Sequence, residues 1–342
     1  MASQDSYALK VGERILVTGA NGFIGSNIVD VLLSLGYIVR GTVRSEKSWL
    51  NELFESKYGA GKFETVNLPT LDDKDALAAA LDSVSGIVHV ASDTSFSPDP
   101  NIINHVVAAT EAVLEAAAQV PSIKRVVLTS SSVSAVARYP GEGRIELTQD
   151  TWNETAIKTA WDKNTPEESK GFLVYVASKT EGERAAYNWV KKNNPSFIFN
   201  SVLPDFTMGE ILHKNSGSTG ALTLQLLEGN DMVINAVISQ YFVDVKDLAR
   251  LHAIALLDPS VKSERIFGLA APLIWKEVID HLRELRPAAS DKLVKNPPGA
   301  REGYVDIVAP TRSKELLNSF FGQADWTTLK ESLYAGITSV GL

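Results

Sequence analysis

The chain has 342 residues, of which 44% are hydrophobic, so it can bury a core large enough for one big domain or two closely packed ones. Its 33 Lys and Arg residues against 41 Asp and Glu residues give a net charge of −8, which argues against wholesale binding to nucleic acid or to anionic membranes. The absence of cysteine excludes disulfides, thiolate zinc sites and cysteine nucleophiles. No apolar run reaches the length of a membrane span and the N-terminal segment lacks a signal-peptide pattern, so we expect a cytoplasmic protein.

The first part of the chain alternates short β-branched runs with longer helical patterns. The runs that read as strands cover residues 14–18, 37–43, 62–68, 86–92, 124–131 and 197–204. Alternation of strand and helix implies crossover connections, so the sequence predicts an α/β fold with a Rossmann-type, doubly wound parallel sheet.

After residue 204 this alternation loosens, and only residues 240–257 restore one strand and one helix. The remainder contains a proline-rich stretch and two amphipathic pieces. We therefore predict a dinucleotide-binding domain built from residues 1–204 and 238–258. A smaller, interleaved C-terminal substrate-binding lobe would take residues 205–237 and 259–342.

A glycine-rich loop, TGANGFIG, follows the first predicted strand and opens a helix. Three glycines in this context suit a tight turn, close approach of the backbone to a pyrophosphate, and close packing of the helix on the strand. The loop lacks the Gly-Lys-Ser/Thr ending of a P-loop, which excludes a nucleoside triphosphate site of that type. The candidate cofactor-binding residues of the loop are Gly19, Asn21, Gly22, Phe23, Ile24 and Gly25.

The second predicted strand ends in VRGTVRS, without the acidic residue that binds the ribose hydroxyls in a typical NAD site. Arg40 and Arg44 occupy this region instead. Guanidinium groups can bind the adenosine 2′-phosphate with charge-assisted hydrogen bonds, so the sequence favours NADPH over NADH.

A tyrosine and a lysine four residues apart, Tyr175 and Lys179, would share one face of a helix. The same spacing occurs at residues 58/62 and 187/191, but the first of these pairs contains two glycines and the second faces about 120° away around the same helix. Only Tyr175 follows the fifth predicted strand closely enough to reach the carboxyl edge of the sheet, where such folds bind ligands.

That fifth strand ends in LTSSSVS, which puts Ser130, Ser131 and Ser132 near the same edge. Reduction of a carbonyl leaves negative charge on its oxygen, so a reductase needs a proton donor and a second hydrogen-bond donor there. Tyr175 would supply the proton and Ser131 the hydrogen bond. A Lys179 cation about 4 Å away could lower the pKa of the phenol by several units.

The motifs TGANGFIG, TSSSVS, YVASK and FVDVKDLA occur in the order found in extended short-chain dehydrogenase/reductases, which the chain resembles over residues 14–258. Within them it is most similar to the dihydroflavonol reductase group, specifically the fungal NADPH-dependent carbonyl (aldehyde) reductases. The resemblance implies Ser131, Tyr175 and Lys179 as the catalytic set, with Ser130 and Ser132 as rivals of Ser131. It also implies that Lys179 holds the nicotinamide ribose.

The resemblance further implies backbone contacts between the cofactor and the segments around Ala91 and Pro204. The chain departs from the family after the third strand, where Pro69 and Thr70 stand in place of an aspartate near the adenine. Asp72 from a shifted loop could substitute, or the adenine contact could be apolar.

The five histidines show no metal-ligand spacing, so we predict no metal, and His89 is expected to be packed or adjacent to the cofactor rather than a base. Phe96, Phe206 and Gln240 lie on loops expected to overhang the cleft, where aromatic rings suit an aryl or ester-bearing carbonyl substrate. A nucleotide-sugar epimerase or dehydratase, and a non-catalytic NADP(H) sensor, are the alternatives. We expect a small-molecule carbonyl substrate, no nucleic-acid or membrane partner, and a monomer or homodimer.

Overall fold

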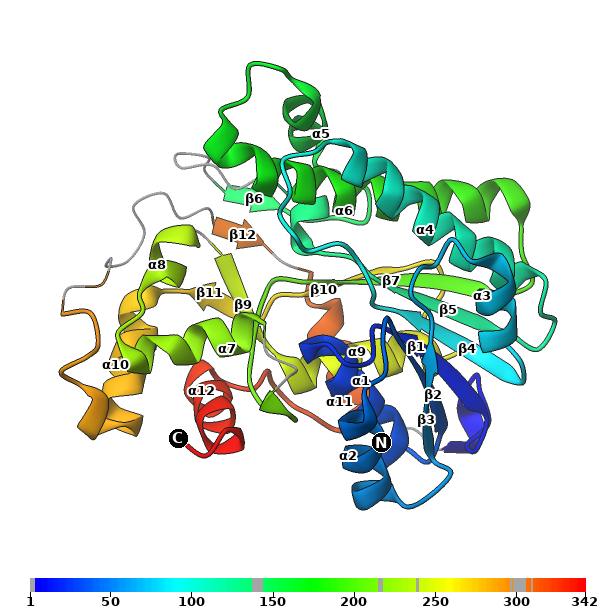
Figure 1. The fold of residues 1–342 in the computed structure, drawn as a ribbon, viewed down its shortest axis with the longest axis horizontal. Coiled ribbons are helices and arrows are strands. Elements are labelled where there is room, and N and C mark those ends of the chain that lie inside the picture. Colours follow the sequence, from blue (N-terminus) through cyan, green and yellow to red (C-terminus); the bar gives the residue numbers. More distant parts are fainter. Residues whose placement is uncertain are drawn as a thin grey trace.

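The computed structural model describes residues 4–136, 144–214, 218–237, 240–295, 297, 306–308 and 310–342. Its centre is a seven-stranded sheet in the order β10-β7-β5-β4-β1-β2-β3, in which every neighbouring pair is parallel (Figure 1). The six predicted strands are all confirmed, with boundaries that differ by a few residues. The strands are β1 Arg14–Thr18, β2 Ile38–Val43, β3 Phe63–Asn67, β4 Val84–His89, β5 Arg125–Thr129, β7 Ile198–Pro204 and β10 Arg265–Gly268.

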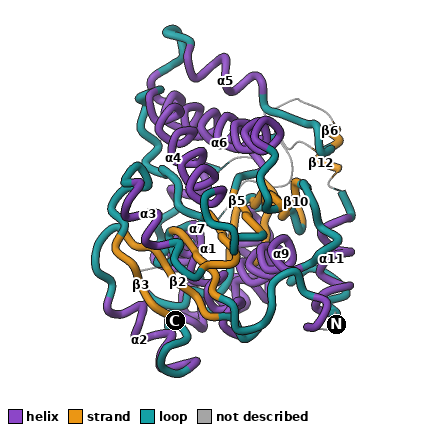
Figure 2. Tube along the Cα trace, turned by 90° about the vertical axis from the view of Figure 1, so that its right-hand side faces the viewer, coloured by secondary structure: helices purple, strands orange, loops and turns teal. Residues whose placement is uncertain are grey.

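Helices cover both faces of this sheet, as a doubly wound fold requires (Figures 1 and 2). Strand residues on the two faces belong to two separate apolar cores. The strands are buried on both sides except the edge strand β3, which is half-buried. One face carries α1 Phe23–Ser34, α2 Ser48–Tyr58, α9 Val245–Leu257 and α11 Arg312–Phe321. The other carries α3 Lys74–Ala80, α4 Asn101–Ala118 and α6 Glu167–Asn193, with α5 Glu154–Trp161 packed outside on α4 and α6.

A smaller lobe lies beside the carboxyl edge of the sheet. Its three-stranded sheet has the order β11-β9-β8, formed by β8 Phe206–Met208, β9 Gln240–Asp244 and β11 Ala271–Leu273. Its helices are α7 Thr219–Leu224, α8 Met232–Ala236, α10 Trp275–Leu285 and α12 Leu329–Ser339. Elsewhere β6 Arg144–Glu146 pairs with β12 Asp306–Val308, and single 3-10 turns form at η1 Gln4–Ser6, η2 Ser132–Ser134, η4 Gln225–Glu228 and η5 Pro287–Ala289.

The predicted division of the chain needs two corrections. β10 extends the large sheet by pairing with β7, and α11 packs its buried residues into the same core, although both had been assigned to the lobe. β9 had been assigned to the dinucleotide-binding domain, yet it pairs with β8 and β11 in the small sheet. The chain therefore crosses between the two sheets more often than its pattern indicated. Within the described residues, no helix is both long and apolar enough to pass through a membrane.

Candidate active site

A cleft of about 640 Å³ lies at the carboxyl ends of the large sheet's strands, between that sheet and the start of α7. Parallel α/β sheets bind their ligands at this edge. Most of the residues that the sequence proposed for the cofactor line it, namely Gly19, Asn21, Gly22, Phe23, Ile24, Gly25, Arg44, Ala91, Tyr175, Lys179 and Pro204.

The glycine loop forms a cradle that side chains would fill. Gly19 has a φ of +65°, and a Cβ there would lie 3.2 Å from the backbone of Ala91. A Cβ on Gly25 would lie 2.3 Å from the carbonyl oxygen of Gly19. Gly22 is the N-cap of α1, so the free N–H groups of that helix start at the floor of the cleft. This geometry fits the pyrophosphate of a dinucleotide.

The expected pair of phosphate-binding arginines needs correction, because Arg40 does not line the cleft. Its guanidinium donates to the carboxylate of Glu64 at 2.8 Å and to the carbonyl oxygens of Ala80 and Asp82 at 2.8 and 2.9 Å. Those carbonyls lie where α3 leads into β4, at the amino edge of the sheet. Arg44 follows the carboxyl end of β2 and does line the cleft, so it remains the candidate for a 2′-phosphate contact.

Thr18 fixes the position and tautomer of His89 at the end of β4. The Thr18 hydroxyl oxygen accepts hydrogen bonds from the N–H groups of Val90 and Ala91, both at 3.0 Å. With both lone pairs occupied, the hydroxyl donates its proton in a hydrogen bond to Nδ1 of His89 at 2.8 Å. The hydrogen of the neutral ring is then on Nε2. Burial lowers the pKa of His89 to about 4, with a smaller effect of the Lys179 cation in the same direction. His89 is therefore a packed, neutral histidine that lines the cleft, and its contact with the cofactor stays a prediction.

The segment after β3, where the chain departs from the resembled family, also lines the cleft through Pro69, Thr70 and Asp72. The hydroxyl of Thr70 accepts a hydrogen bond from the N–H of Asp72 at 3.2 Å, which tightens this turn. Polar and apolar groups both face the cleft there, so the two predicted kinds of adenine contact stay open.

Tyr175 and Lys179 lie on α6, one helical turn apart, and line the cleft together with Ser131. Lys179 and Ser131 are buried, and Tyr175 is half-buried. The Nζ of Lys179 donates to the carbonyl oxygen of Thr129 at 3.4 Å. Of the rival serines, Ser130 turns its hydroxyl to Glu183, at 2.9 Å, and Ser132 does not line the cleft. Ser131 is the serine that acts on Tyr175, where its hydroxyl lowers the pKa of the phenol, and the same hydroxyl donates to the carbonyl oxygen of Pro204 at 3.5 Å.

The pKa of Tyr175 shifts in the opposite direction to the one expected from the sequence. Burial is the largest influence on Tyr175 and raises its pKa; the hydrogen bond with Ser131 lowers it and the nearby charge of Asp205 raises it further. Lys179 is not among these influences, so the predicted lowering of the phenol pKa is not found in this structure. Burial also lowers the pKa of Lys179 to about 8, opposed by the charge of Glu183. Near neutral pH Tyr175 is a phenol and Lys179 is mostly an ammonium.

The three predicted substrate residues have different outcomes. Phe96 is not among the residues that line the cleft, but its ring contacts that of Tyr175, which does, at 4.9 Å between centroids. Phe206 is buried in the core of the lobe, edge-on to Trp275, and this prediction was wrong. Gln240 begins β9, and its side chain lies outside the described part of the structure.

Sequence reasoning missed several residues of the cleft. Asp205 follows β7 and accepts from the N–H groups of Phe206 and Tyr241, at 2.9 and 3.0 Å. Ser218 and Thr219 enter from the lobe at the start of α7. A polar residue directly after a predicted central strand was a usable signal for Asp205, whereas the α7 residues depend on a lobe whose packing the pattern did not specify.

Comparison with known proteins agrees with this geometry. Residues 15–270 match the family described as the NAD dependent epimerase/dehydratase family. The chain is 40% identical to the ketoreductase nvfG of Aspergillus novofumigatus over 98% of its own length and 99% of the relative's, and 35% identical to aldehyde reductase 2 of Sporidiobolus salmonicolor over 97% of each.

Among solved structures, yeast methylglyoxal/isovaleraldehyde reductase Gre2, complexed with NADPH, superposes with a TM-score of 0.79 at 22% identity, over 96% of this chain and 98% of that one. At that identity the likeness concerns the fold. The family match and the curated relatives together show that the chain belongs to the NAD dependent epimerase/dehydratase family, the extended short-chain dehydrogenase/reductases that its motifs resemble.

Proposed function

We propose that this protein reduces aldehydes and ketones to alcohols with NADPH, and that Tyr175 donates the proton. The observation that carries the proposal is the grouping of Tyr175, Ser131 and Lys179 in one cleft with the glycine cradle. Relatives named ketoreductase and aldehyde reductase, which match nearly the whole chain, support the same reaction.

Each side chain has a task in this reaction. A bound NADPH would supply the hydride to the carbonyl carbon. Tyr175 passes its phenolic proton to the carbonyl oxygen, and its raised pKa keeps that proton in place until negative charge develops there. The Ser131 hydroxyl donates a second hydrogen bond to the same oxygen.

Lys179 supplies positive charge beside the phenol. Its ammonium is fixed by the Thr129 carbonyl and lies one turn of α6 from Tyr175, so it can stabilise the tyrosinate that remains after proton transfer. Water then returns a proton to Tyr175 before the next turnover. The resembled family uses this lysine to hold the nicotinamide ribose, and we propose the same role for Lys179.

Arg44 supports the preference for NADPH. It lines the cleft just after β2, where an acidic residue would instead bind the ribose hydroxyls of NADH. Gre2, which shares this fold, has been solved as a complex with NADPH. The Arg44 guanidinium is therefore assigned to the 2′-phosphate.

Phe96 supports activated or aryl carbonyls, including keto esters, as the substrate class. Its ring lies against Tyr175 and is 52% exposed, and Phe172 on α6 is 6.4 Å from Tyr175 between ring centroids. Two rings beside the proton donor form an apolar wall on which an aromatic substrate can stack.

An epimerase or dehydratase reaction is the second candidate, because the relative terH of Aspergillus terreus, 38% identical, is named an NAD-dependent epimerase/dehydratase. Such an enzyme would regenerate its cofactor within each turnover. Finding NAD bound to the purified protein would favour it. Arg44 in the cleft favours NADPH, and hence the reductase.

The test is the initial rate of NADPH oxidation with a keto ester and an aryl aldehyde, compared with NADH and with the variant Tyr175→Phe. The reductase requires fast oxidation of NADPH, slower oxidation of NADH, and loss of nearly all turnover in the variant with cofactor binding kept. Tight NADPH binding without turnover of any carbonyl would instead favour a non-catalytic sensor.

A further inference from the structure

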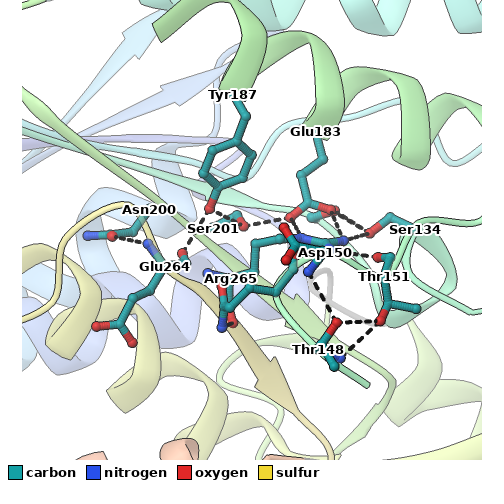
Figure 3. Close-up of polar contacts among 12 residues, drawn as sticks. Ser134, Thr148, Asp150, Thr151, Glu183, Tyr187, Asn200, Ser201, Glu264 and Arg265 are labelled. Carbon is teal, nitrogen blue, oxygen red and sulfur yellow. Dashed lines mark hydrogen bonds and ion pairs between the residues drawn. The ribbon is translucent and has the colours of Figure 1, made fainter. Parts of the chain in front are cut away.

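Glu183 on α6 and Arg265 on β10 form a buried ion pair, which Figure 3 shows with its polar contacts. Nε and Nη2 of Arg265 donate to the two carboxylate oxygens of Glu183 at 2.9 and 3.0 Å. The side chain of Glu183 is 0% exposed and that of Arg265 is 3% exposed. Removing two charges from water is costly, and an apolar pair often stabilises a fold as well, so such a pair calls for a reason beyond stability.

Glu183 lies on α6 four residues after Lys179, on the same face of the helix. Its charge raises the pKa of Lys179 against the effect of burial. Of the other titratable groups at this end of the cleft, Tyr175 on α6 and His89 at the end of β4 are neutral near pH 7, because burial raises the pKa of the first and lowers that of the second to about 4. Asp205, after β7, also lines the cleft, and its charge acts on Tyr175. Glu183 thus supplies negative charge that favours the ammonium.

The same carboxylate binds residues 130–134, here called the serine loop, on both sides of Ser131. Ser130 donates to Glu183 at 2.9 Å, and the hydroxyl of Ser134 donates to the same oxygen. Ser201 of β7 donates to the other oxygen at 2.6 Å. Because residues 130 and 134 are both tied to α6, the backbone that carries Ser131 is held at a fixed distance from the helix that carries Tyr175.

Arg265 completes the connection from β10. Its Nη1 donates to the carbonyl oxygens of Gln149 and Thr151 at 3.1 and 2.6 Å, and its guanidinium carbon lies 3.9 Å from the ring centroid of Trp152. Tyr187, also near the carboxylate, donates to the carbonyl oxygen of Glu264 at 2.9 Å. The pair therefore joins the outermost strand and the segment before α5 to the serine loop and α6 (Figure 3).

We propose that Glu183 and Arg265 are the positioning pair of this active site: the carboxylate fixes the loop around Ser131 and places a negative charge beside Lys179. The proposal rests on the proposed reductase function. It differs from a merely structural role, in which removal of the pair would change stability and leave the chemistry of the folded enzyme intact.

The test uses paired substitutions, because removing one partner would leave the other charge buried alone and could prevent folding. Glu183→Gln/Arg265→Met removes both charges and keeps an amide oxygen that can accept from the serines. Glu183→Leu/Arg265→Met removes the charges and the anchors together. Circular dichroism and thermal melting first establish that each variant is folded.

A matched control is the neighbouring pair of Glu264 and Arg312. This pair is also bidentate, at 2.9 and 3.0 Å, and Glu264 is adjacent to Arg265 in sequence, but neither residue lines the cleft. Glu264→Gln/Arg312→Met should keep the kinetic constants and pH profile of the wild type.

In the Gln/Met variant, activity is expected to fall with rising pH about one unit earlier than in the wild type, because Lys179 loses the charge that favours its ammonium. The Leu/Met variant should show the same shift and in addition a drop in kcat of about 100-fold, with a smaller change in KM, because Ser131 is no longer held on its target oxygen. Folded variants with wild-type kcat, KM and pH profile would overturn the proposal.

Cofactor affinity gives a readout that does not need turnover. The dissociation constant of NADPH can be measured from its fluorescence over the same pH series. As the pH rises, this constant should begin to increase at a lower pH in both variants than in the wild type. If the wild type reduces no carbonyl, the proposed function fails, but this pH dependence still tests the pair. Identical affinity profiles in wild type and variants would then reject the effect on Lys179.

Discussion

The ring of Phe96 lies against the ring of Tyr175, with 4.9 Å between centroids and 48° between planes. Phe96 has a φ of +54°, in the left-handed region that a phenylalanine rarely adopts. Its loop docks on α6 at Gly171, where a Cβ would lie 2.1 Å from the carbonyl oxygen of Phe96. We therefore propose that this exposed ring, held by strained backbone beside the proposed proton donor, has a role in binding rather than in folding.

Phe96→Ala is therefore expected to raise KM for an aryl ketone by about 3- to 10-fold, the value of one aromatic contact, with little change in kcat. Steady-state kinetics with an aryl and a small aliphatic ketone would measure it, and the aliphatic substrate should be affected less. Tyr334→Ala, which removes another exposed ring on the remote helix α12, is the control. Equal KM values for the aryl ketone in the variant and the wild type would contradict the role of Phe96.

Arg44 and Arg40 offer a matched pair for cofactor preference. Arg44→Gln should weaken NADPH binding by about 10- to 100-fold, the loss of charge-assisted hydrogen bonds, and leave NADH binding nearly unchanged. Arg40→Gln should leave the ratio of the two affinities unchanged and lower the melting temperature, because its bonds to Glu64, Ala80 and Asp82 are internal. Dissociation constants for both cofactors would decide; a change in the affinity ratio on replacing Arg40 would contradict this assignment.

The sequence assigned both arginines to the phosphate, although only Arg44 lines the cleft, and the reason is geometric. Both lie near one strand, but Arg40 is in its middle and turns toward the amino edge, while Arg44 follows the carboxyl end. Spacing along a strand indicates which face a side chain takes, and it does not indicate which edge a long side chain reaches. Phe206 was misplaced for a similar reason, since its partner Trp275 is remote in sequence.

The central sheet was predictable because its first six strands are short runs rich in β-branched residues that alternate with helical patterns. β10 has only four residues, Arg265–Gly268, and lies in a stretch without the strand and helix alternation. Glu183 could be noticed from its spacing after Lys179, but its partner Arg265 belongs to that unpredicted strand. The proposed catalytic residues were visible as local motifs, whereas the ion pair beside them depends on the pairing of segments that are distant in sequence.

Asp244 should make stability depend on pH. Burial raises its pKa to about 6, opposed by the hydrogen bond from Ser332 and reinforced by the charge of Asp247. Because the folded pKa exceeds the unfolded one, the stability that protonated Asp244 contributes is present below about pH 4 and is lost as pH rises through about 6.

Asp244→Asn removes this charge and keeps a good N-cap for α9. The free energy of unfolding of the variant minus that of the wild type should increase by on the order of 2 kcal/mol as the pH rises from about 4 to 7. Urea unfolding across this range measures the difference, with Asp231→Asn, at the exposed N-cap of α8, as the control. A constant difference across the range would show that Asp244 has an ordinary pKa.

His252 should act in the opposite direction. It is fully buried on α9, where one ring nitrogen donates to the carbonyl oxygen of Leu248 at 2.8 Å and the other accepts from the hydroxyl of Thr129 at 2.8 Å. Both bonds are made by the neutral ring. Burial lowers its pKa to about 4, opposed in part by the bond to Leu248.

The folded pKa of His252 lies below the unfolded value, so its contribution to stability is present above about pH 6.5 and is lost as pH falls through about 4. Glutamine in His252→Gln keeps a donor and an acceptor but cannot titrate. The variant should be less stable than the wild type at neutral pH. Between about pH 7 and pH 5, however, its free energy of unfolding should fall by about 2 kcal/mol less than that of the wild type. Urea unfolding of wild type and variant at the two pH values measures this, with a substitution at the half-buried His281, His281→Gln, as the control. Parallel losses in the wild type and His252→Gln would assign the acid sensitivity to other groups, of which His89, also buried with a pKa of about 4, is the next to replace.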